Sequence, residues 1–399
     1  MNKILMVVDN EFTSDPRVYN EAKILVNANY DVQVLCFNFS VLPINEERDG
    51  IKIHRLTISK KLKDYLFSSV NTIALYDCYW AYQINKATKS FNPDFIHVHD
   101  LYMARAANWA NIRKKIKLIL DLHENYPAAV MSYNWAIKYP KRLLARPSKW
   151  RKKERRFLNF ADRIIVLSEE YRNSLIHKYP EIKKENFVIY PNVPDLKELF
   201  SYKIDYNIFN TEGKTLFYFG GIAERRGIFT CIEALKILID EGINVKLLLI
   251  GPVDRADQIR FTKVINEITV RNHIIHYPWK DISTLPSYLF KSFACLSPII
   301  KNEQHESGVA NKVFQYMLFK RPVIVSNCTP QVSIIEKYAC GLVFRSEDAN
   351  DLALKIKFLI DHPKEVMKMG ENGQEAVLNK YNLENYKINL LNLYESLAE

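Results

Sequence analysis

The sequence has no apolar run long enough to cross a membrane. Its uncharged apolar stretches fall short of the roughly 18 residues that a spanning helix needs. The N-terminal stretch MNKILMVVDNEF is also unlike a signal peptide, because its short apolar run passes directly into a turn, as a first buried strand does. We therefore expect neither a membrane-spanning helix nor a secretory leader.

Cysteine is scarce and shows no pattern. The chain has six cysteines among 399 residues, and no two of them form a C-x-x-C pair. Most lie in apolar surroundings, so we expect reduced thiols in the core of a cytosolic protein. The same scattering argues against a structural zinc site.

Several catalytic signatures are missing as well. The sequence contains no Walker loop, no G-x-S-x-G elbow and no H-E-x-x-H motif. The first predicted strand is followed by DNEFTSD, which has no glycine. A nicotinamide-binding Rossmann domain needs glycines at that turn so that the pyrophosphate can approach the backbone, and the sequence therefore argues against such an enzyme.

What the sequence does contain is a repeated alternation of short apolar runs and amphipathic segments. The runs KILMVV, DVQVLCF, DFIHVHD, KLILDLHE and RIIVLS come first, and TLFYFGG, VKLLLIG, HIIHYPW, FACLSPI, PVIVS and CGLVF come later. Between the two sets, a proline-containing polar stretch near residues 191–205 reads as a linker. The pattern predicts two doubly wound α/β domains, with the ligand site in a cleft between them at the carboxyl ends of the strands.

Positive charge is concentrated in one segment. Residues 138–157 hold ten Lys or Arg residues against one Glu, and the whole chain has a net charge of +11. Bulky apolar residues are interleaved with these cations, namely Leu143, Leu144, Trp150 and Phe157. This combination favours a segment that binds an anionic membrane surface over a merely solvated helix face. Nucleic acid is a weaker alternative, because no nucleic-acid-binding motif accompanies the segment.

Polar residues follow four of the predicted strands, where a ligand site of such a fold is expected. Three glycines and two arginines occur in FGGIAERRG, and His–acid pairs end HVHD and DLHE. The fourth strand end leads into HESGVANKVFQYM, a small polar loop that feeds a helix. Arginines and a helix N-terminus suit a diphosphate, whereas the His–acid pairs suit sugar hydroxyls.

These segments, in this order, resemble the family-4 retaining glycosyltransferases of the GT-B fold (glycosyl transferases group 1). The resemblance includes DPRVYNEAKIL, ADRIIVLSEE, VIYPNVPD, NKVFQYMLFKRPVIVS and the terminal KYNLENYKINLLNLYESL, and covers nearly the whole chain. It implies two Rossmann-like domains that face each other across a cleft. Residues 1–192 would bind the acceptor and residues 193–381 the nucleotide-sugar, with a C-terminal helix at 382–399 packing back on the first domain.

The resemblance also implies roles for individual residues. Those expected to bind the donor are Gly220, Gly221, Arg225, Arg226, Gly251, Ser307, Gly308, Val309, Asn311, Lys312 and Gln315. Those expected to bind the acceptor are Asp15, Arg17, His99, Asp100, His123 and Glu124. The catalytic group is expected to be His123, Glu306 and Arg226.

Two positions depart from the family pattern. Many members carry two glutamates eight residues apart, which contact the sugar and the ribose, but this chain has Ser307 and Gln315 at those places. Glu306 is the neighbouring candidate for the first glutamate. The family also has Arg after the first glycine of the FGG segment, where this chain has Gly221, and the positive charge is partly moved to Arg225 and Arg226.

The activity implied is retaining transfer of a hexosyl or N-acetylhexosaminyl group from a UDP-sugar or GDP-sugar to a glycan or lipid-linked hydroxyl. No metal and no cofactor are expected, and the site would serve bacterial envelope polysaccharide or lipopolysaccharide synthesis at the cytoplasmic membrane face. The alternatives are a nucleotide-sugar 2-epimerase of the same fold and a non-catalytic protein that binds nucleotide-sugar or anionic lipid. An RNA-binding protein that uses the basic segment is a further alternative.

Overall fold

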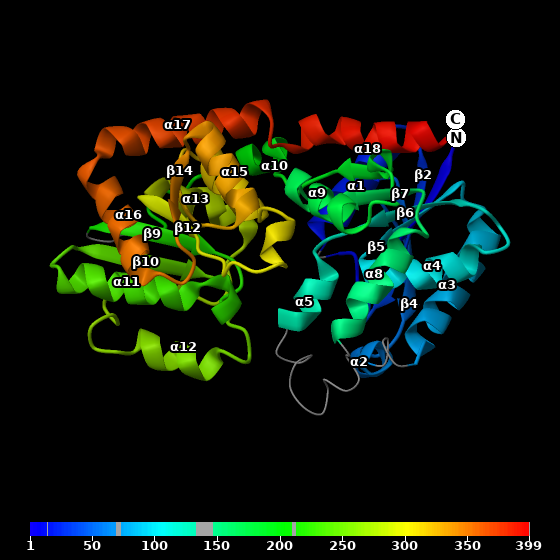
Figure 1. Ribbon diagram of the computed structural model, residues 1–399, viewed down its shortest axis with the longest axis horizontal. Helices are drawn as coiled ribbons and strands as arrows, with labels where there is room; N and C mark the ends of the chain where they lie inside the picture. Colours follow the sequence, from blue (N-terminus) through cyan, green and yellow to red (C-terminus); the bar gives the residue numbers. More distant parts are fainter. Residues whose placement is uncertain (14, 69–72, 133–146, 210–212, 399) are drawn as a thin grey trace. The chain divides into compact units, whose positions relative to one another are not determined.

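The computed structural model describes residues 1–13, 15–68, 73–132, 147–209 and 213–398. The chain forms two compact units, of which the first comprises Met1–Pro191 with Tyr386–Glu399 and the second comprises Asn192–Asn385 (Figure 1). The division lies one residue from the expected boundary after residue 192. Within the described residues, no helix is long and apolar enough to span a membrane.

The first unit is built on an eight-stranded sheet with the order β3-β4-β2-β1-β5-β6-β7-β8. Its strands are β1 (Lys3–Val7), β2 (Asp31–Asn38), β3 (Asn45–Arg48), β4 (Ile51–Thr57), β5 (Phe95–His99), β6 (Lys117–Asp121), β7 (Arg163–Val166) and β8 (Phe187–Ile189). All neighbouring pairs are parallel except β3 with β4 at the edge. The expected doubly wound sheet is therefore present, with one antiparallel edge strand added.

Helices cover both faces of this sheet (Figure 1). They are α1 (Pro16–Asn27), α2 (Lys60–Ser68), α3 (Leu75–Phe91), α4 (Ala104–Asn111), α5 (Tyr126–Ser132), α8 (Trp150–Leu158), α9 (Glu169–Lys178) and most of α18 (Leu383–Ala398). Side chains alternate between the faces of a strand. On β5, Ile96 and Val98 therefore pack in the core with α3 and α4, while His97 faces Tyr394 of α18.

The second unit has a fully parallel six-stranded sheet with the order β11-β10-β9-β12-β13-β14. Its strands are β9 (Lys214–Phe219), β10 (Val245–Ile250), β11 (Ile274–Tyr277), β12 (Ala294–Ser297), β13 (Val323–Ser326) and β14 (Gly341–Phe344). Its helices are α10 (Leu196–Ser201), α11 (Ile228–Asp240), α12 (Gln258–Ile265), α13 (Leu285–Lys291), α14 (Asn311–Leu318), α15 (Thr329–Tyr338), α16 (Ala349–Asp361) and α17 (Pro363–Asn379).

The strand order of the second sheet has its switch point at β9 and β12. The chain leaves β9 toward β10 on one side and returns to β12 on the other, so the loops after these two strands diverge and leave room at their carboxyl ends. The loop after β9 carries the two arginines, and the loop after β12 leads into α14. The topology thus places the expected donor-binding segments at one edge of one sheet.

Candidate functional site

In the first unit, the polar strand ends converge on Asp121, the last residue of β6. Arg17 of α1 binds this buried carboxylate with two hydrogen bonds, in which Nε and Nη2 donate to Oδ2 and Oδ1 at 2.9 Å each. Arg17 also donates to the backbone oxygen of Tyr190 at 3.0 Å. Burial opposes ionisation, but Arg17 and then His123 hold the pKa of Asp121 well below its ordinary value. Asp121 is therefore a fixed negative charge at the sheet edge.

His123 lies against this carboxylate. Its Nε2 is 3.2 Å from Oδ2 of Asp121 and 3.1 Å from Nδ1 of His99. Burial alone would lower the pKa of His123, but the carboxylates of Asp121 and Asp100 overcome that effect and raise it to about 9. At neutral pH the imidazole is therefore a cation, and it can donate a hydrogen bond to a ligand.

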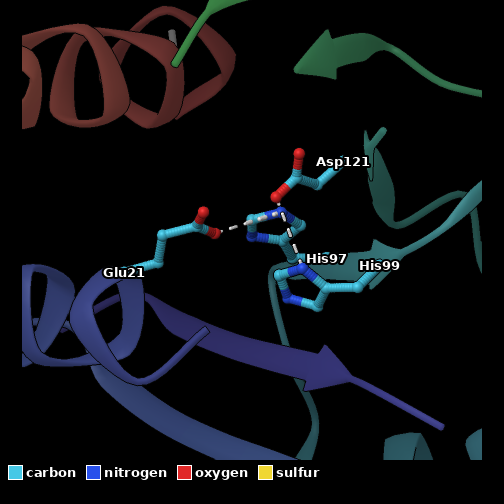
Figure 2. Close-up of side chains that lie close together, drawn as sticks. All are labelled: Glu21, His97, His99 and Asp121. Atoms are coloured by element: carbon cyan, nitrogen blue, oxygen red, sulfur yellow. Dashed lines mark ion pairs between the residues drawn. The ribbon is translucent and has the colours of Figure 1, made fainter. Parts of the chain in front are cut away.

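Figure 2 shows the group of ionisable side chains around Asp121, namely Glu21, His97 and His99, which are all fully buried. The rings of His97 and His99 stack with centroids 4.5 Å apart, and His97 Nε2 lies 3.8 Å from Oε2 of Glu21. Burial and the neighbouring Asp121 raise the pKa of Glu21 well above its ordinary value. On its other side, Nδ1 of His97 is 2.8 Å from the hydroxyl of Tyr394 on α18.

This cluster raises the question of a metal site, because one potential ligand atom from each of four residues lies within 4.8 Å of the others. The four residues are Glu21, His97, His99 and Asp121. Arg17 already contacts both carboxylates, with its Nε 3.1 Å from Oε1 of Glu21. The two imidazoles are stacked, with planes only 27° apart, so they do not point at a common centre. The cluster therefore fits an internal ion-pair network better than a metal centre.

Asp100 lies beside this network in a left-handed backbone conformation, with φ of 72°. Tyr102 Oη is within hydrogen-bonding distance of both Asp100 Oδ2, at 3.0 Å, and Asp9 Oδ1, at 2.9 Å. Burial raises the pKa of Asp100 to about 7. This carboxyl group can therefore change its charge near neutral pH.

The remaining residues predicted to bind the acceptor have mainly internal partners. Asp15 caps α1 by accepting the N–H of Val18 at 3.2 Å. Arg17 and His99 are buried behind His123, which gives both a supporting position in place of the predicted direct contact. Glu124 follows His123 directly in the chain and is partly buried.

The basic segment differs from the prediction in its apolar part. Leu143 and Leu144 lie outside the described residues, whereas Trp150 and Phe157 pack in the core at 1% and 2% exposure. The expectation that these two aromatic rings contact a membrane is therefore wrong, because α8 turns its apolar side inward. Its other side remains strongly basic, with exposed cations Arg151, Lys152, Arg155 and Arg156.

In the second unit, Lys312 in the first turn of α14 is the most unusual charged group. It is 8% exposed, and its Nζ lies 3.7 Å from the centre of the Tyr218 ring. Burial, followed by the nearby Arg226, lowers its pKa well below the ordinary value. Among the described residues, no carboxylate forms an ion pair with Lys312. A buried ammonium beside a guanidinium, without an acidic partner, is the environment that an anion would stabilise.

The glycines beside Lys312 bring the backbone of two loops together. Gly220 directly follows β9 with φ of 133°, and a Cβ at this position would lie 3.5 Å from Nζ of Lys312. Gly251 directly follows β10 with φ of 148°, and a Cβ there would lie 2.0 Å from the oxygen of Gly220. Any other residue at position 251 would therefore push these two loops apart. Gly221 has no atom near its missing side chain, and Tyr218 donates to its oxygen at 2.8 Å.

The two replaced glutamate positions also lie in this region. Gln315 is buried on α14 at 8% exposure. Glu306 accepts the N–H of Thr329 with both carboxylate oxygens at 3.1 Å each, so it stabilises the N-terminus of α15. Ser307 is buried and donates to the oxygen of Gln304 at 2.6 Å. Both candidates for the missing first glutamate therefore have internal partners.

Two polar residues, one in each unit, were not among the predicted site residues. The first is Asp121, the carboxylate that holds His123. His305, directly before Glu306, is buried at 6% exposure near Arg225, Arg226 and Lys312. Because β6 ends at Asp121, both Asp121 and His123 lie at the carboxyl end of this strand, and the D-x-H spacing in LDLHE could have indicated Asp121; no sequence signal singled out His305.

Comparison with known proteins identifies the family of this chain. The model of Glycosyltransferase Family 4 matches residues 17–198, and that of Glycosyl transferases group 1 matches residues 203–376. The capsular polysaccharide biosynthesis glycosyltransferase CapM of Staphylococcus aureus is 25% identical over 170 residues, or 41% of either chain. The alignments with curated relatives cover from 41% to 64% of those proteins.

Solved structures show the same fold over the whole chain. A sucrose-phosphate synthase from Thermosynechococcus elongatus superposes with a TM-score of 0.79 at 17% identity, covering 100% of this chain and 99% of that one. HepE of Anabaena, solved with UDP and glucose, superposes with a TM-score of 0.74 at 13% identity, covering 99% and 100%. Between them, the two family models match most of the chain, which belongs to the family-4 glycosyltransferases of the GT-B fold.

Proposed function

We propose that the protein transfers a hexosyl or N-acetylhexosaminyl group from a UDP-sugar or GDP-sugar to a hydroxyl group of a glycan or lipid-linked acceptor, with retention of configuration. The observation that carries this proposal is the environment of Lys312, which lies over Tyr218 and beside Arg226 with no acidic partner among the described residues. A diphosphate supplies the negative charge that such a group lacks. The proposed donor-binding residues all belong to the second unit.

In this proposal, the second unit stabilises the leaving group. Negative charge grows on the diphosphate as the bond from the sugar to the phosphate breaks, and Arg226, Arg225 and Lys312 are placed to balance it. The N-terminus of α14, where Lys312 lies, adds positive potential. Since an anion favours the charged form of a lysine, binding of the donor is expected to raise the pKa of Lys312 toward its ordinary value.

The first unit contributes a hydrogen-bond donor for the sugar or the acceptor. Because Asp121 and Asp100 keep His123 protonated at neutral pH, its imidazole cannot act as a base. Its Nε2 faces Asp121 and His99, so Nδ1 is the nitrogen that can meet a ligand. The acceptor proton must then leave by another route, and in a front-face retaining mechanism an oxygen of the departing diphosphate takes it. No metal or cofactor is required by this scheme.

We further propose that the acceptor belongs to envelope polysaccharide or lipopolysaccharide synthesis at the cytoplasmic face of a membrane, with the enzyme attached peripherally. The similarity to CapM supports this role. The exposed cations of α8 are suited to anionic headgroups, and Tyr82 and Trp109 on the neighbouring helices α3 and α4 expose aromatic rings. This part fails if the protein does not bind vesicles of anionic phospholipid at low salt.

A second candidate is a nucleotide-sugar 2-epimerase. It is favoured by Asp100, whose pKa of about 7 would allow it to exchange a proton with a substrate near neutral pH. The two reactions give different products from the same donor. An epimerase changes the sugar of the nucleotide-sugar without releasing nucleoside diphosphate, whereas the transferase releases it.

The test is a panel of UDP- and GDP-sugars incubated with the protein without an acceptor, followed by chromatography of the nucleotide products. We expect one donor to be hydrolysed slowly to nucleoside diphosphate and free sugar, and the Arg226→Ala variant to lose this activity. A non-catalytic binding protein would bind a donor and leave it intact. Unchanged hydrolysis by Arg226→Ala would refute the role of Arg226.

A further inference from the structure

The loop between β12 and α14 holds a histidine whose tautomer is fixed by the backbone. Nδ1 of His305 lies 2.6 Å from the carbonyl oxygen of Ile300. Because a carbonyl oxygen can only accept, Nδ1 must carry the hydrogen, and Nε2 of the neutral ring then presents a lone pair. Nε2 is buried and has no hydrogen-bond partner among the described residues. Leaving a buried acceptor without a donor is energetically unfavourable, so Nε2 is a candidate contact atom for a ligand.

The surroundings of His305 keep the ring neutral. Burial lowers its pKa to about 4, and the positive charges of Arg226, Arg225 and Lys312 act in the same direction. A neutral ring with a fixed Nδ1–H cannot donate from Nε2 to a phosphate oxygen. The atom that binds Nε2 must instead carry a hydrogen, as a sugar hydroxyl does.

A second acceptor of the same kind occurs six residues further along this segment. Oδ1 of Asn311, the first residue of α14, is also buried without a hydrogen-bond partner among the described residues. The cations near this loop suit the oxygens of a diphosphate. In contrast, Nε2 of His305 and Oδ1 of Asn311 can only accept hydrogen bonds, so they suit hydroxyl groups. The loop therefore combines a place for phosphate with a place for hydroxyl groups.

The carboxylate that the family pattern predicts here is not free for the same task. Both oxygens of Glu306 accept from Thr329, and the hydroxyl of Ser307 donates to Gln304. His305 is the residue of this loop with an unpartnered acceptor atom in the interior. A neutral imidazole nitrogen can accept a hydrogen bond as a carboxylate does, without adding negative charge beside the diphosphate.

We propose that Nε2 of His305 accepts a hydrogen bond from a hydroxyl group of the transferred sugar, in place of the family's first glutamate. Oδ1 of Asn311 accepts a second hydrogen bond from the same nucleotide-sugar. His305 then contributes to the choice of sugar, because a deoxy sugar would leave its nitrogen without a donor. This inference rests on the proposed binding of a nucleotide-sugar by the second unit, and it adds the contact that recognises the sugar.

The test compares nucleotides with and without a sugar. Calorimetric affinities for UDP, UDP-glucose, UDP-N-acetylglucosamine, GDP and GDP-mannose are measured for the wild type, His305→Phe and His305→Gln. We expect His305→Phe to weaken binding of the preferred nucleotide-sugar about tenfold, as loss of one buried hydrogen bond predicts, and to leave the affinity for its nucleoside diphosphate unchanged. His305→Gln should restore most of the lost affinity, since its amide oxygen can accept at the place of Nε2.

His362 provides a matched control, because its Nδ1 also faces a backbone oxygen, that of Phe358 at 2.8 Å, but its side chain is exposed. The variant His362→Phe should bind both ligand classes as the wild type does. If His305→Phe lowered the affinities for nucleoside diphosphate and nucleotide-sugar equally, His305 would only support the loop, and the proposal would be refuted. An unchanged affinity for the nucleotide-sugar would also overturn the proposal. If the wild type bound none of the five ligands, the proposed function itself would fail.

Discussion

Replacing Lys312 by methionine should have opposite effects on stability and on ligand binding. In the ligand-free protein the ammonium is buried over Tyr218 and is repelled by Arg226, so the folded state bears the cost of its charge. Methionine keeps most of the side-chain volume and removes the charge. We expect the Lys312→Met variant to be more stable than the wild type by about 1 kcal/mol, because a buried charge without an acidic partner is replaced by an apolar group.

The same substitution should weaken binding of a nucleoside diphosphate. A unit charge about 4 Å from a phosphate contributes roughly 4 kcal/mol at an effective dielectric constant of 20. Part of this is offset by desolvation, and Arg225 and Arg226 remain. We therefore expect a net loss of about 2.7 kcal/mol, or about a hundredfold rise in Kd for UDP or GDP.

Urea unfolding and titration calorimetry measure the two effects on the same samples. Lys337→Met is the control, since Lys337 also lies over a tyrosine ring, that of Tyr338 at 5.5 Å, but is exposed. It should change neither quantity appreciably. A Lys312→Met variant that is less stable than the wild type, or that binds UDP and GDP equally well, would refute the assignment of Lys312 to an anion site.

Three further predictions concern the other parts of the site. Asp121→Asn should lower kcat by about tenfold and lower the pKa of His123 measured by NMR, and a His123 pKa that stays raised in that variant would contradict the ion pair. Since the pKa of His123 is raised to about 9, its stabilising contribution is complete below pH 6.5 and is lost as the pH rises to 9. Urea unfolding should show a loss on the order of 2 kcal/mol over this interval that His123→Gln lacks. Gln315→Glu should tighten binding of the nucleotide-sugar several-fold if the residue contacts the ribose, and calorimetry showing no gain would remove that contact.

The fold could be predicted from the sequence because both sheets are parallel apart from one short edge strand. Strands buried on both faces read as continuous apolar runs, and the helices between them follow an amphipathic pattern. Three strands of the first sheet, β3, β4 and β8, are not among the predicted apolar runs. The sequence of β3, NEER, is polar and largely exposed, so no apolar run marks it. The start of α1 follows from local sequence as well, because Asp15 caps the helix and Pro16 fits its first turn.

The site could be predicted only in outline. The strand ends and the resemblance to the family indicate which segments carry the polar residues of the site. They do not show which of these residues pair with each other. Arg17 lies 104 positions from Asp121 in the chain, and nothing local in either segment reveals that they pair. The burial of Trp150 and Phe157 was missed because residues seven apart on a helix share a face, and the sequence does not say whether that face turns inward.

The cysteines behave as expected within the described structure. None of the six is bonded to another, and five of them are buried, with Cys78 exposed. Burial raises the pKa of the Cys231 thiol to about 12, so this group near Lys312 stays protonated and is not a competing nucleophile.

We propose that this protein transfers a sugar with retention of configuration from a nucleotide-sugar bound by Lys312, Arg225 and Arg226. The most direct measurement follows the anomeric proton by NMR while the protein consumes the α-linked donor found in the panel, with methanol present as a simple acceptor. We expect release of nucleoside diphosphate and an initial product that keeps the α configuration. An initial β product, an epimerised donor, or no consumption of any donor would contradict it.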